Sequence, residues 1–198
     1  SMADFWIYFN IGLKHVISIF AYDHILFLLA LTVPYEFKSW KKILILVSFF
    51  TLGHTLALFL SVFNILSIKS TVVEFLIPVT ILIAALYNII ISGKSSKKEN
   101  ITFVGFCTLF FGIIHGLGFS NYFNSILPGS AADKLLPLLE FALGIEASQI
   151  IVVFVVLVIS YIAQTFFRFS KRDWALVLSA FIIGLVLPML IENEIWNR

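Results

Sequence analysis

Six long apolar stretches, each close to the length of a membrane-spanning helix, constrain the fold of this chain more than any other feature. They cover residues 12–34, 41–63, 71–92, 101–120, 137–165 and 174–191. An α-helix rises about 1.5 Å per residue, so about 20 apolar residues cross the hydrocarbon core of a bilayer. Hydrophobic residues make up 61% of the chain and charged residues 12%, whereas a soluble domain carries about 25% charged residues. The sequence therefore predicts an all-α, polytopic membrane helix bundle.

The N-terminal apolar run, residues 4–33, is too long for one upright helix. Its first part, FWIYFNIGLKH, is interpreted as an interfacial helix, a tilted extension or a short seventh segment, with residues 1–11 as the interfacial part. Among the connectors, only the one at residues 121–137 is long, and we expect it outside the membrane. The whole chain, residues 1–198, is predicted to form a single transmembrane domain.

Basic residues are distributed unevenly between alternate connectors. Nine lie on one side, namely Lys38, Lys41, Lys42, Lys94, Lys97, Lys98, Arg168, Lys171 and Arg172. Four lie on the other, namely Lys14, Lys69, Lys134 and Arg198. Cytoplasmic connectors carry the excess of Lys and Arg, so both termini are predicted outside, in a multi-pass protein of a bacterial-type inner (cytoplasmic) membrane. The expected partners are membrane lipid and a metal ion, without nucleic acid, and no protein partner is indicated.

Eight polar residues interrupt the apolar stretches: His15, Asp23, His24, His54, His115, Glu140, Glu146 and Gln149. An ionisable group in the bilayer costs about 2.5–3.5 kcal/mol on insertion scales. One such residue is explained by a structural hydrogen bond between helices. Seven ionisable groups from four stretches need mutual compensation or a ligand. They predict a shared polar site in the outer half of the membrane, because the inner halves of the same stretches are almost entirely apolar.

The chemistry of these side chains favours a divalent metal. Neutral imidazole and ionised carboxylate bind Zn, Ni and Co without any thiolate, and the single cysteine, Cys107, lies in an apolar run. The predicted ligands are His24, His54, His115, Asp23 and Glu146. Residues expected around the ligands or at the rim are His15, Gln149, Glu140, Thr51 and Thr55. A proton relay built from the same residue types is the alternative without metal.

Two local patterns bear on how this site is built. Asp23 and His24 are adjacent and do not point the same way on a regular helix, so one is expected to bind metal while the other orients a neighbouring histidine. Gly112 and Gly116 form a GxxxG step beside His115, which predicts that another helix approaches the backbone there.

Four sequence blocks carry a family resemblance: HVISIFAYDHILFLLAL, FFTLGHTLAL, FGIIHGLGF and FALGIEASQ. Because of the order and spacing of these four blocks, the chain resembles the HupE/UreJ family of small membrane proteins over nearly its whole length. Members are generally described as nickel or cobalt permeases associated with metalloenzyme maturation. The resemblance implies metal handling by the Asp-His pair, the His-Gly motif and the polar positions of the other two blocks, here Asp23, His24, His115, Gly116, His54 and Glu146.

The chain also departs from the family pattern. The pattern has a histidine six residues before the aspartate, where this chain has Ile17, and the nearest upstream histidine is His15. Ile114 precedes His115 where the pattern has phenylalanine, and no glutamate follows shortly after Gly118. The chain therefore resembles a divergent branch.

Three functions follow from these patterns. The first is a nickel, cobalt or zinc permease with an outward-facing site of histidines and carboxylates. The second is a metal-dependent intramembrane hydrolase or transferase that acts on a lipid or lipoprotein from the outer leaflet. In that enzyme Glu146 or Asp23 would be the general base and residues 121–137 would cover the substrate. The third is a metal sensor or a structural partner without catalysis. The sequence leaves open whether the protein is an enzyme.

Overall fold

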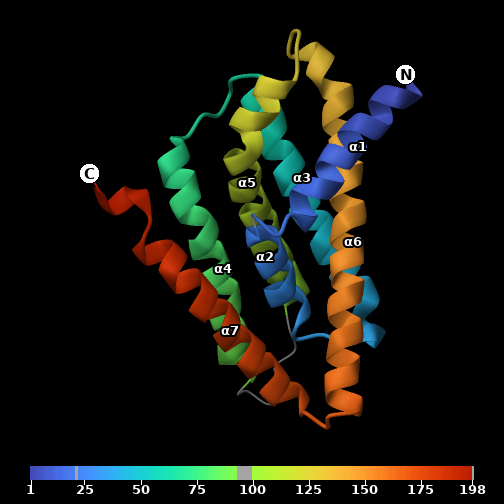
Figure 1. The fold of residues 1–198 in the computed structure, drawn as a ribbon, viewed down its shortest axis with the longest axis vertical. Coiled ribbons are helices and arrows are strands. Elements are labelled where there is room, and N and C mark those ends of the chain that lie inside the picture. The colour runs from blue at the N-terminus through green and yellow to red at the C-terminus, as the bar shows by residue number, and fades with distance from the viewer. Residues whose placement is uncertain (21, 93–99, 198) are drawn as a thin grey trace.

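The computed structural model describes residues 1–20, 22–92 and 100–197, and within these ranges it contains helices and no strand (Figure 1). The α-helices are α1 Met2–Ile17, α2 Asp23–Thr32, α3 Trp40–Val62, α4 Ser70–Ser92, α5 Ile101–Ile126, α6 Leu135–Thr165 and α7 Lys171–Ile191. The five helices from α3 to α7 are long and apolar enough to cross a membrane. The prediction of an all-α polytopic bundle is confirmed.

The bundle consists of three closely packed helix pairs arranged around a short central helix. The pairs are α3 with α5, α1 with α6, and α4 with α7. Helix α2 lies between them and packs mainly against α4 and α6 (Figure 1). Its side chains are buried on all sides, from His24 through Phe27 to Thr32. A helix that is apolar all round is stable in such a central position.

The first predicted span is wrong in one respect, because residues 12–34 do not form a continuous helix. Helix α1 ends at Ile17, where Ser18 has an extended ψ of 121°, and α2 begins at Asp23. The run is therefore two helices, as the interpretation with a seventh segment allowed. At 1.5 Å per residue, α2 is about 15 Å long and does not cross a bilayer by itself. The break places Asp23 and His24 in the first turn of α2, inside the bundle.

The other end of α2 is fixed by a hydrogen bond from α4. In a continuing helix the carbonyl of Ala30 would accept a hydrogen bond from the amide of residue 34, but Pro34 has no N–H. The Asn88 side chain supplies the missing donor, with its Nδ2 2.7 Å from the Ala30 oxygen. A buried carbonyl without a partner costs about 1–3 kcal/mol, so this contact ties α2 to α4.

Glycines allow the paired helices to approach at backbone distance. A Cβ on Gly112 would collide with the carbonyl oxygen of Phe50, and one on Gly116 would lie 2.9 Å from the Cα of His54. The close approach predicted beside His115 is thus confirmed, and the neighbour is α3. Gly12 of α1 and Gly144 of α6 bring that second pair together in the same way.

Both termini lie toward one end of the bundle, here called the terminal end, together with the connectors at residues 63–69 and 127–134 (Figure 1). Helix α5 continues to Ile126, so the first part of the long connector predicted at 121–137 is helical. The side of the membrane that the terminal end faces stays a prediction. Four of the basic residues on which this prediction depends lie outside the described residues, namely Lys94, Lys97, Lys98 and Arg198.

Candidate metal centre

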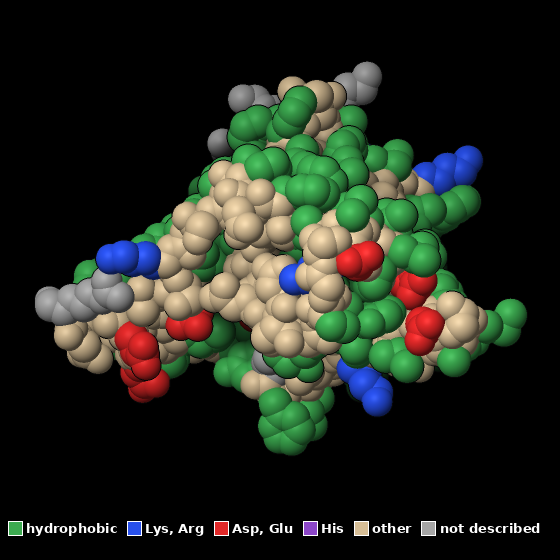
Figure 2. Space-filling model, turned by 90° about the horizontal axis from the view of Figure 1, so that it is seen from above, with side chains coloured by type: hydrophobic (Ala, Val, Ile, Leu, Met, Phe, Trp, Pro, Cys, Tyr) green, Lys and Arg blue, Asp and Glu red, His purple; other side chains and the backbone are tan. Residues whose placement is uncertain are grey.

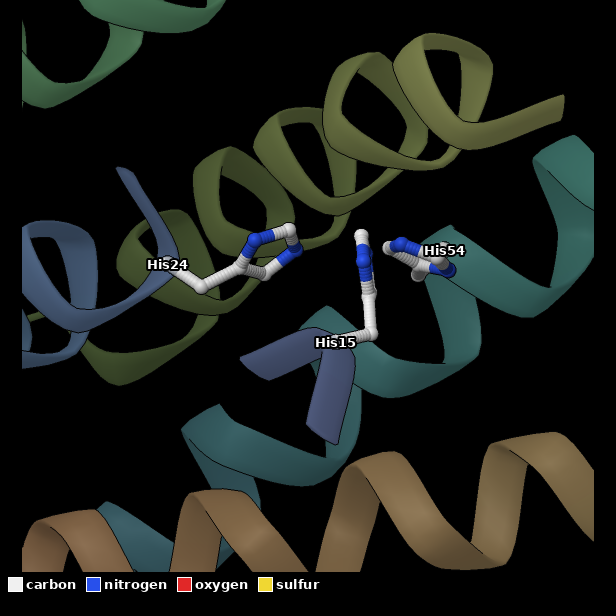
Figure 3. A group of neighbouring side chains, drawn as sticks. All are labelled: His15, His24 and His54. Atoms are coloured by element: carbon white, nitrogen blue, oxygen red, sulfur yellow. The ribbon is translucent and has the colours of Figure 1, made fainter. Parts of the chain in front are cut away.

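The four histidines converge from four different helices. His15 lies in the last turn of α1, His24 in the first turn of α2, His54 on α3 and His115 on α5. The ring of His15 is 4.5 Å from that of His24 and 5.5 Å from that of His54, centroid to centroid, and His24 is 5.1 Å from His115. Figure 3 shows the His15 ring standing between the rings of His24 and His54. The four imidazoles, which come from four helices, therefore form one cluster.

The cluster contains two groups of ligand atoms that share one residue. The first group is His15, His24 and His54, and the second is Asp23, His24 and His115. Within each group the ligand atoms lie within 4.8 Å of one another. His24 belongs to both groups, and its imidazole has two ring nitrogens.

His15 is much closer to the centre than its predicted place near the rim. Helix α1 ends at Ile17, two residues after His15. The last turn of α1 therefore lies inside the bundle and does not continue into a longer helix. The family's histidine position, six residues before Asp23, is Ile17 here, and Ile17 is exposed. His15 instead provides an imidazole from the same helix end.

Asp23 and His24 both face the cluster although they are adjacent in sequence. The Asp23 carboxylate oxygen Oδ1 lies 3.6 Å from Nδ1 of His24. Both residues belong to the first turn of α2, and this end of the helix lies at the cluster, so each side chain reaches it from its own face of the helix. The carboxylate also lies at a helix N-terminus, where the helix dipole favours negative charge.

Most of the ring nitrogens in this cluster are buried and have no hydrogen-bond partner among the described residues. They are Nε2 of His15, both nitrogens of His24, both nitrogens of His54, and Nδ1 of His115. His54 is completely buried, and His115 and His24 are 1% and 3% exposed. Such groups are rare in proteins and call for an explanation. Lone pairs of neutral imidazoles beside one carboxylate fit a divalent transition metal.

Thr80 of α4 fixes the orientation of the fourth histidine. Its hydroxyl donates to the carbonyl of Ile77 at 2.7 Å and lies 3.0 Å from Nε2 of His115. Since the single hydroxyl hydrogen is used, Thr80 accepts a hydrogen bond from Nε2–H of His115. The lone pair of His115 is then on Nδ1, the nitrogen without a partner. Histidine ligands of metals are commonly oriented in this way. No sequence pattern pointed to Thr80, because threonine is common in membrane helices.

Aromatic rings enclose the histidines on two sides. Toward the terminal end, Phe119 lies 4.0 Å from His15 and stacks on Phe141 at 4.9 Å, centroid to centroid. Toward the opposite end, Phe27 stacks on Phe50 at 4.9 Å and lies 5.4 Å from His115. On the face of the terminal end drawn in Figure 2, none of the described histidines reaches the surface.

The remaining predicted site residues lie elsewhere. Glu146 belongs to neither ligand group, and its carboxylate accepts hydrogen bonds from Ser48 at 2.7 Å and Thr51 at 2.5 Å on α3. Gln149 is fully buried beside the same Thr51. Also outside both groups are Glu140, which is buried, and Thr55, which is half-buried. The structure thus brings together Asp23 and the four histidines, and Glu146 is in neither of their ligand groups.

The fold and this cluster define a polytopic membrane protein with buried imidazole groups suited to a transition-metal ion. The sequence model of one protein family, described as HupE / UreJ protein, matches residues 1–193. The chain therefore belongs to the HupE/UreJ family, as its sequence resemblance implied. No curated protein and no solved structure matches the chain.

Proposed function

We propose that this protein is a permease for divalent transition-metal ions, with nickel or cobalt as the first candidates and zinc next. The observation that supports it best is the pair of ligand groups that share His24. An ion that passes from one group to the other keeps one protein ligand throughout and does not have to enter hydrocarbon as a bare cation. The family match supports nickel or cobalt, since that family is associated with their transport.

The ligand groups suggest an order of steps across the bundle. The first group, with His15 and His54, lies against the phenylalanines of the terminal end. The second group includes His115, which is packed against Phe27 on the opposite side. In the proposed path a metal ion binds the three imidazoles first and then exchanges His15 and His54 for Asp23 and His115. The gain of a carboxylate would offset the loss of water around the ion.

A cavity continues the proposed path toward the opposite end. It has a volume of about 210 Å³ between α2, α4 and α5 and is lined by Phe27, Phe111 and Tyr35, among others. The rings of Phe27 and Phe111 are 5.9 Å apart, centroid to centroid, at the end of the cavity near His115. Passage would require these rings to move, which agrees with the almost entirely apolar inner halves of the spans.

The proposal is tested by metal uptake into liposomes that contain the purified protein. We expect His24→Ala to reduce nickel uptake at least 10-fold, because both ligand groups lose a member. Ser148→Ala is the matched control: it removes a buried hydroxyl of α6 that hydrogen-bonds within its own helix, to Ile145. Uptake by His24→Ala equal to that of the unmodified protein would contradict the proposal.

The enzyme alternative makes a different prediction in the same experiment. A metal-dependent hydrolase or transferase would bind one metal ion tightly and show no flux. It would also need a substrate path to the metal, whereas aromatic rings cover the imidazoles on two sides and the cavity is lined by none of the four histidines. A metal ion is much smaller than a lipid or lipoprotein, so this enclosure weighs less against transport than against the enzyme.

A further inference from the structure

Two neighbouring hollows lie between the start of α3 and the last turns of α6, at the end of the bundle opposite the terminal end (Figure 1). The first, here called the polar pocket, has a volume of about 340 Å³. Its polar lining residues are Glu36, Lys38, Ser160, Tyr161, Gln164 and Thr165. The second, here called the apolar groove, has a volume of about 550 Å³ and is lined by hydrophobic side chains. Phe37 and Leu157 line both, so the pocket continues into the groove.

One stripe of α6 borders both hollows and changes from hydrophobic to polar along the helix. Along the apolar groove it contains Ile150, Val153, Phe154 and Leu157, and along the polar pocket it continues with Ser160, Tyr161 and Gln164. Residues at intervals of three and four share one face of a helix. On α3 the groove is bordered by residues with the same spacing, Trp40, Ile43, Leu44 and Val47. A ligand that follows this stripe therefore needs a hydrophobic part and a polar part.

The change along the stripe lies where a membrane lipid has its own border between acyl chain and headgroup. The hydrocarbon of one leaflet is about 15 Å deep, and the residues from Ile150 to Leu157 span about 10 Å along α6. Trp40 and Tyr161 beside this border are 54% and 55% exposed, and exposed Trp and Tyr are typical of the membrane–water interface. The apolar groove thus has the depth of one leaflet, and the polar pocket lies at its surface.

Phe37 packs against α6 at the level where the stripe changes. Its ring is 6.1 Å from that of Phe154 and 6.3 Å from that of Tyr161, centroid to centroid. These contacts hold the short helical turn before α3, η1 (Phe37–Ser39), against α6. Lys38 is the next residue of this turn and lines the polar pocket. The position of its ammonium group therefore follows from the packing of Phe37.

Lysines give the polar pocket an excess of positive charge. Residues 36–42 contain three lysines and one glutamate. Nζ of Lys38 lies 3.1 Å from Oε2 of Glu36, and the lysine side chain is 79% exposed. An exposed ion pair of this kind is weak, so a phosphate group can replace the carboxylate. Lys41 and Lys42 hold their Nζ atoms 5.5 and 5.7 Å from the centroids of aromatic rings that line the groove and the pocket.

We infer that the polar pocket and the apolar groove together bind one anionic phospholipid from the leaflet at this end of the bundle. In this complex the phosphate lies at Lys38, with Gln164 and Thr165 as hydrogen-bond donors, and one acyl chain lies in the groove. Basic pockets between membrane helices on the cytoplasmic side bind acidic headgroups. This end of the bundle is the one predicted to face the cytoplasm.

The charge of the polar pocket distinguishes this occupant from two others. A second copy of the chain, related by a two-fold axis along the membrane normal, would present the same surface from both sides. The lysines of both copies would then meet at the same depth, and like charges repel. A zwitterionic lipid would fill the groove but would leave the excess of lysine without a counter-charge. An anionic phospholipid satisfies both hollows.

Native mass spectrometry of the delipidated protein in detergent, titrated with dioleoylphosphatidylglycerol, tests the inference. We expect about one tightly bound lipid per chain, and an affinity about 5-fold lower in Lys38→Gln, the usual effect of one lysine near an anionic lipid surface. Leu44→Trp fills the groove and should weaken binding at least 10-fold. The matched controls are Lys69→Gln, an exposed lysine of the terminal end, and Leu52→Trp, an exposed leucine of α3 outside the groove. Thermal unfolding verifies that each variant is folded.

Four outcomes would contradict the inference. Dioleoylphosphatidylcholine bound as tightly would show that the lysines do not select the headgroup, and unchanged binding in both Lys38→Gln and Leu44→Trp would place the lipid elsewhere. Displacement of the lipid by glycerol 3-phosphate at equal concentration would show that the groove holds no acyl chain. A dimer that Leu44→Trp dissociates would make the groove an interface between copies. Nickel uptake is no readout here, so the result is independent of the permease.

Discussion

At the scale of single residues, the site depends on which imidazole nitrogens keep a free lone pair. Thr80 determines this for His115, since its hydroxyl accepts a hydrogen bond from Nε2 and leaves Nδ1 for the metal. In the part of the chain that the structure describes, His24 and His54 have no such partner, and we expect the metal itself to orient them.

We predict that Thr80→Val weakens nickel binding about 10- to 100-fold, the usual effect of losing a hydrogen bond to a metal-binding histidine. The variant removes the acceptor for Nε2–H of His115 at nearly constant side-chain volume. Isothermal titration of the purified protein with Ni²⁺ measures the affinity. Ser148→Ala again serves as the control, and an unchanged affinity in Thr80→Val would show that Thr80 does not orient the ligand.

Residue types alone predicted much of this site. Asp23, His24, His54 and His115 were found because histidine and aspartate are rare and costly in apolar stretches. The place of His15 was not predicted, since residues 18–22 contain no glycine or proline that would mark the end of α1. Glu146 was grouped with the histidines because a carboxylate can bind metal and because its expected depth in the membrane matched theirs. The neighbours of Glu146, however, depend on how α6 packs against α3.

At the scale of helices, close packing of α3 and α5 holds His54 beside His115. A methyl group on Gly116 would lie 2.8 Å from the Ala57 Cβ and 2.9 Å from the His54 Cα. Backbone atoms of α3 cannot give way as a flexible side chain does, so the two helices would have to separate.

We predict that Gly116→Ala destabilises the protein by about 1–3 kcal/mol, as overpacking commonly does, and lowers nickel affinity at least 10-fold. Gly184→Ala in α7 is the matched control, because its Cβ would enter open space. It should be neutral or slightly stabilising, since alanine favours helix more than glycine. Thermal unfolding in detergent and nickel titration check both variants, and equal melting temperatures would contradict the packing argument.

The helical elements were largely predictable because apolar length is a strong signal. The spans at 41–63 and 71–92 agree with α3 and α4 within a residue at each end. The break between α1 and α2 was not predictable in position. It depends on tertiary contacts, since α2 is stable only where α4 and α6 bury it on all sides.

At the scale of the whole molecule, the terminal end combines both chain ends with two connectors (Figure 1). The connector from Leu127 is ordered by a turn in which Asp133 accepts hydrogen bonds from the amide and hydroxyl of Ser130. These bonds hold the pKa of the Asp133 carboxyl below its usual value, so its charge persists at neutral pH.

Connectors on one side of the membrane hold nine basic residues, and those on the other side hold four. Since cytoplasmic connectors carry the excess of Lys and Arg, we predict that the terminal end faces the outside. Green fluorescent protein, which is fluorescent only when it folds in the cytoplasm, should be dark when fused to the C-terminus. The same protein fused after Ser170, in the connector at the opposite end, should be fluorescent. The reverse pattern would show that the bundle has the opposite orientation.

The breaks that flank α2 have a mechanical consequence. At one end the chain leaves the helical path between Ile17 and Asp23, and at the other Pro34 interrupts the backbone ladder that Asn88 completes. Helix α2 can accordingly pivot as a rigid rod without unwinding a neighbour. A swing about its Asn88 attachment would carry Asp23 and His24 through the widest arc. The other six α-helices would be the frame within which this short helix turns.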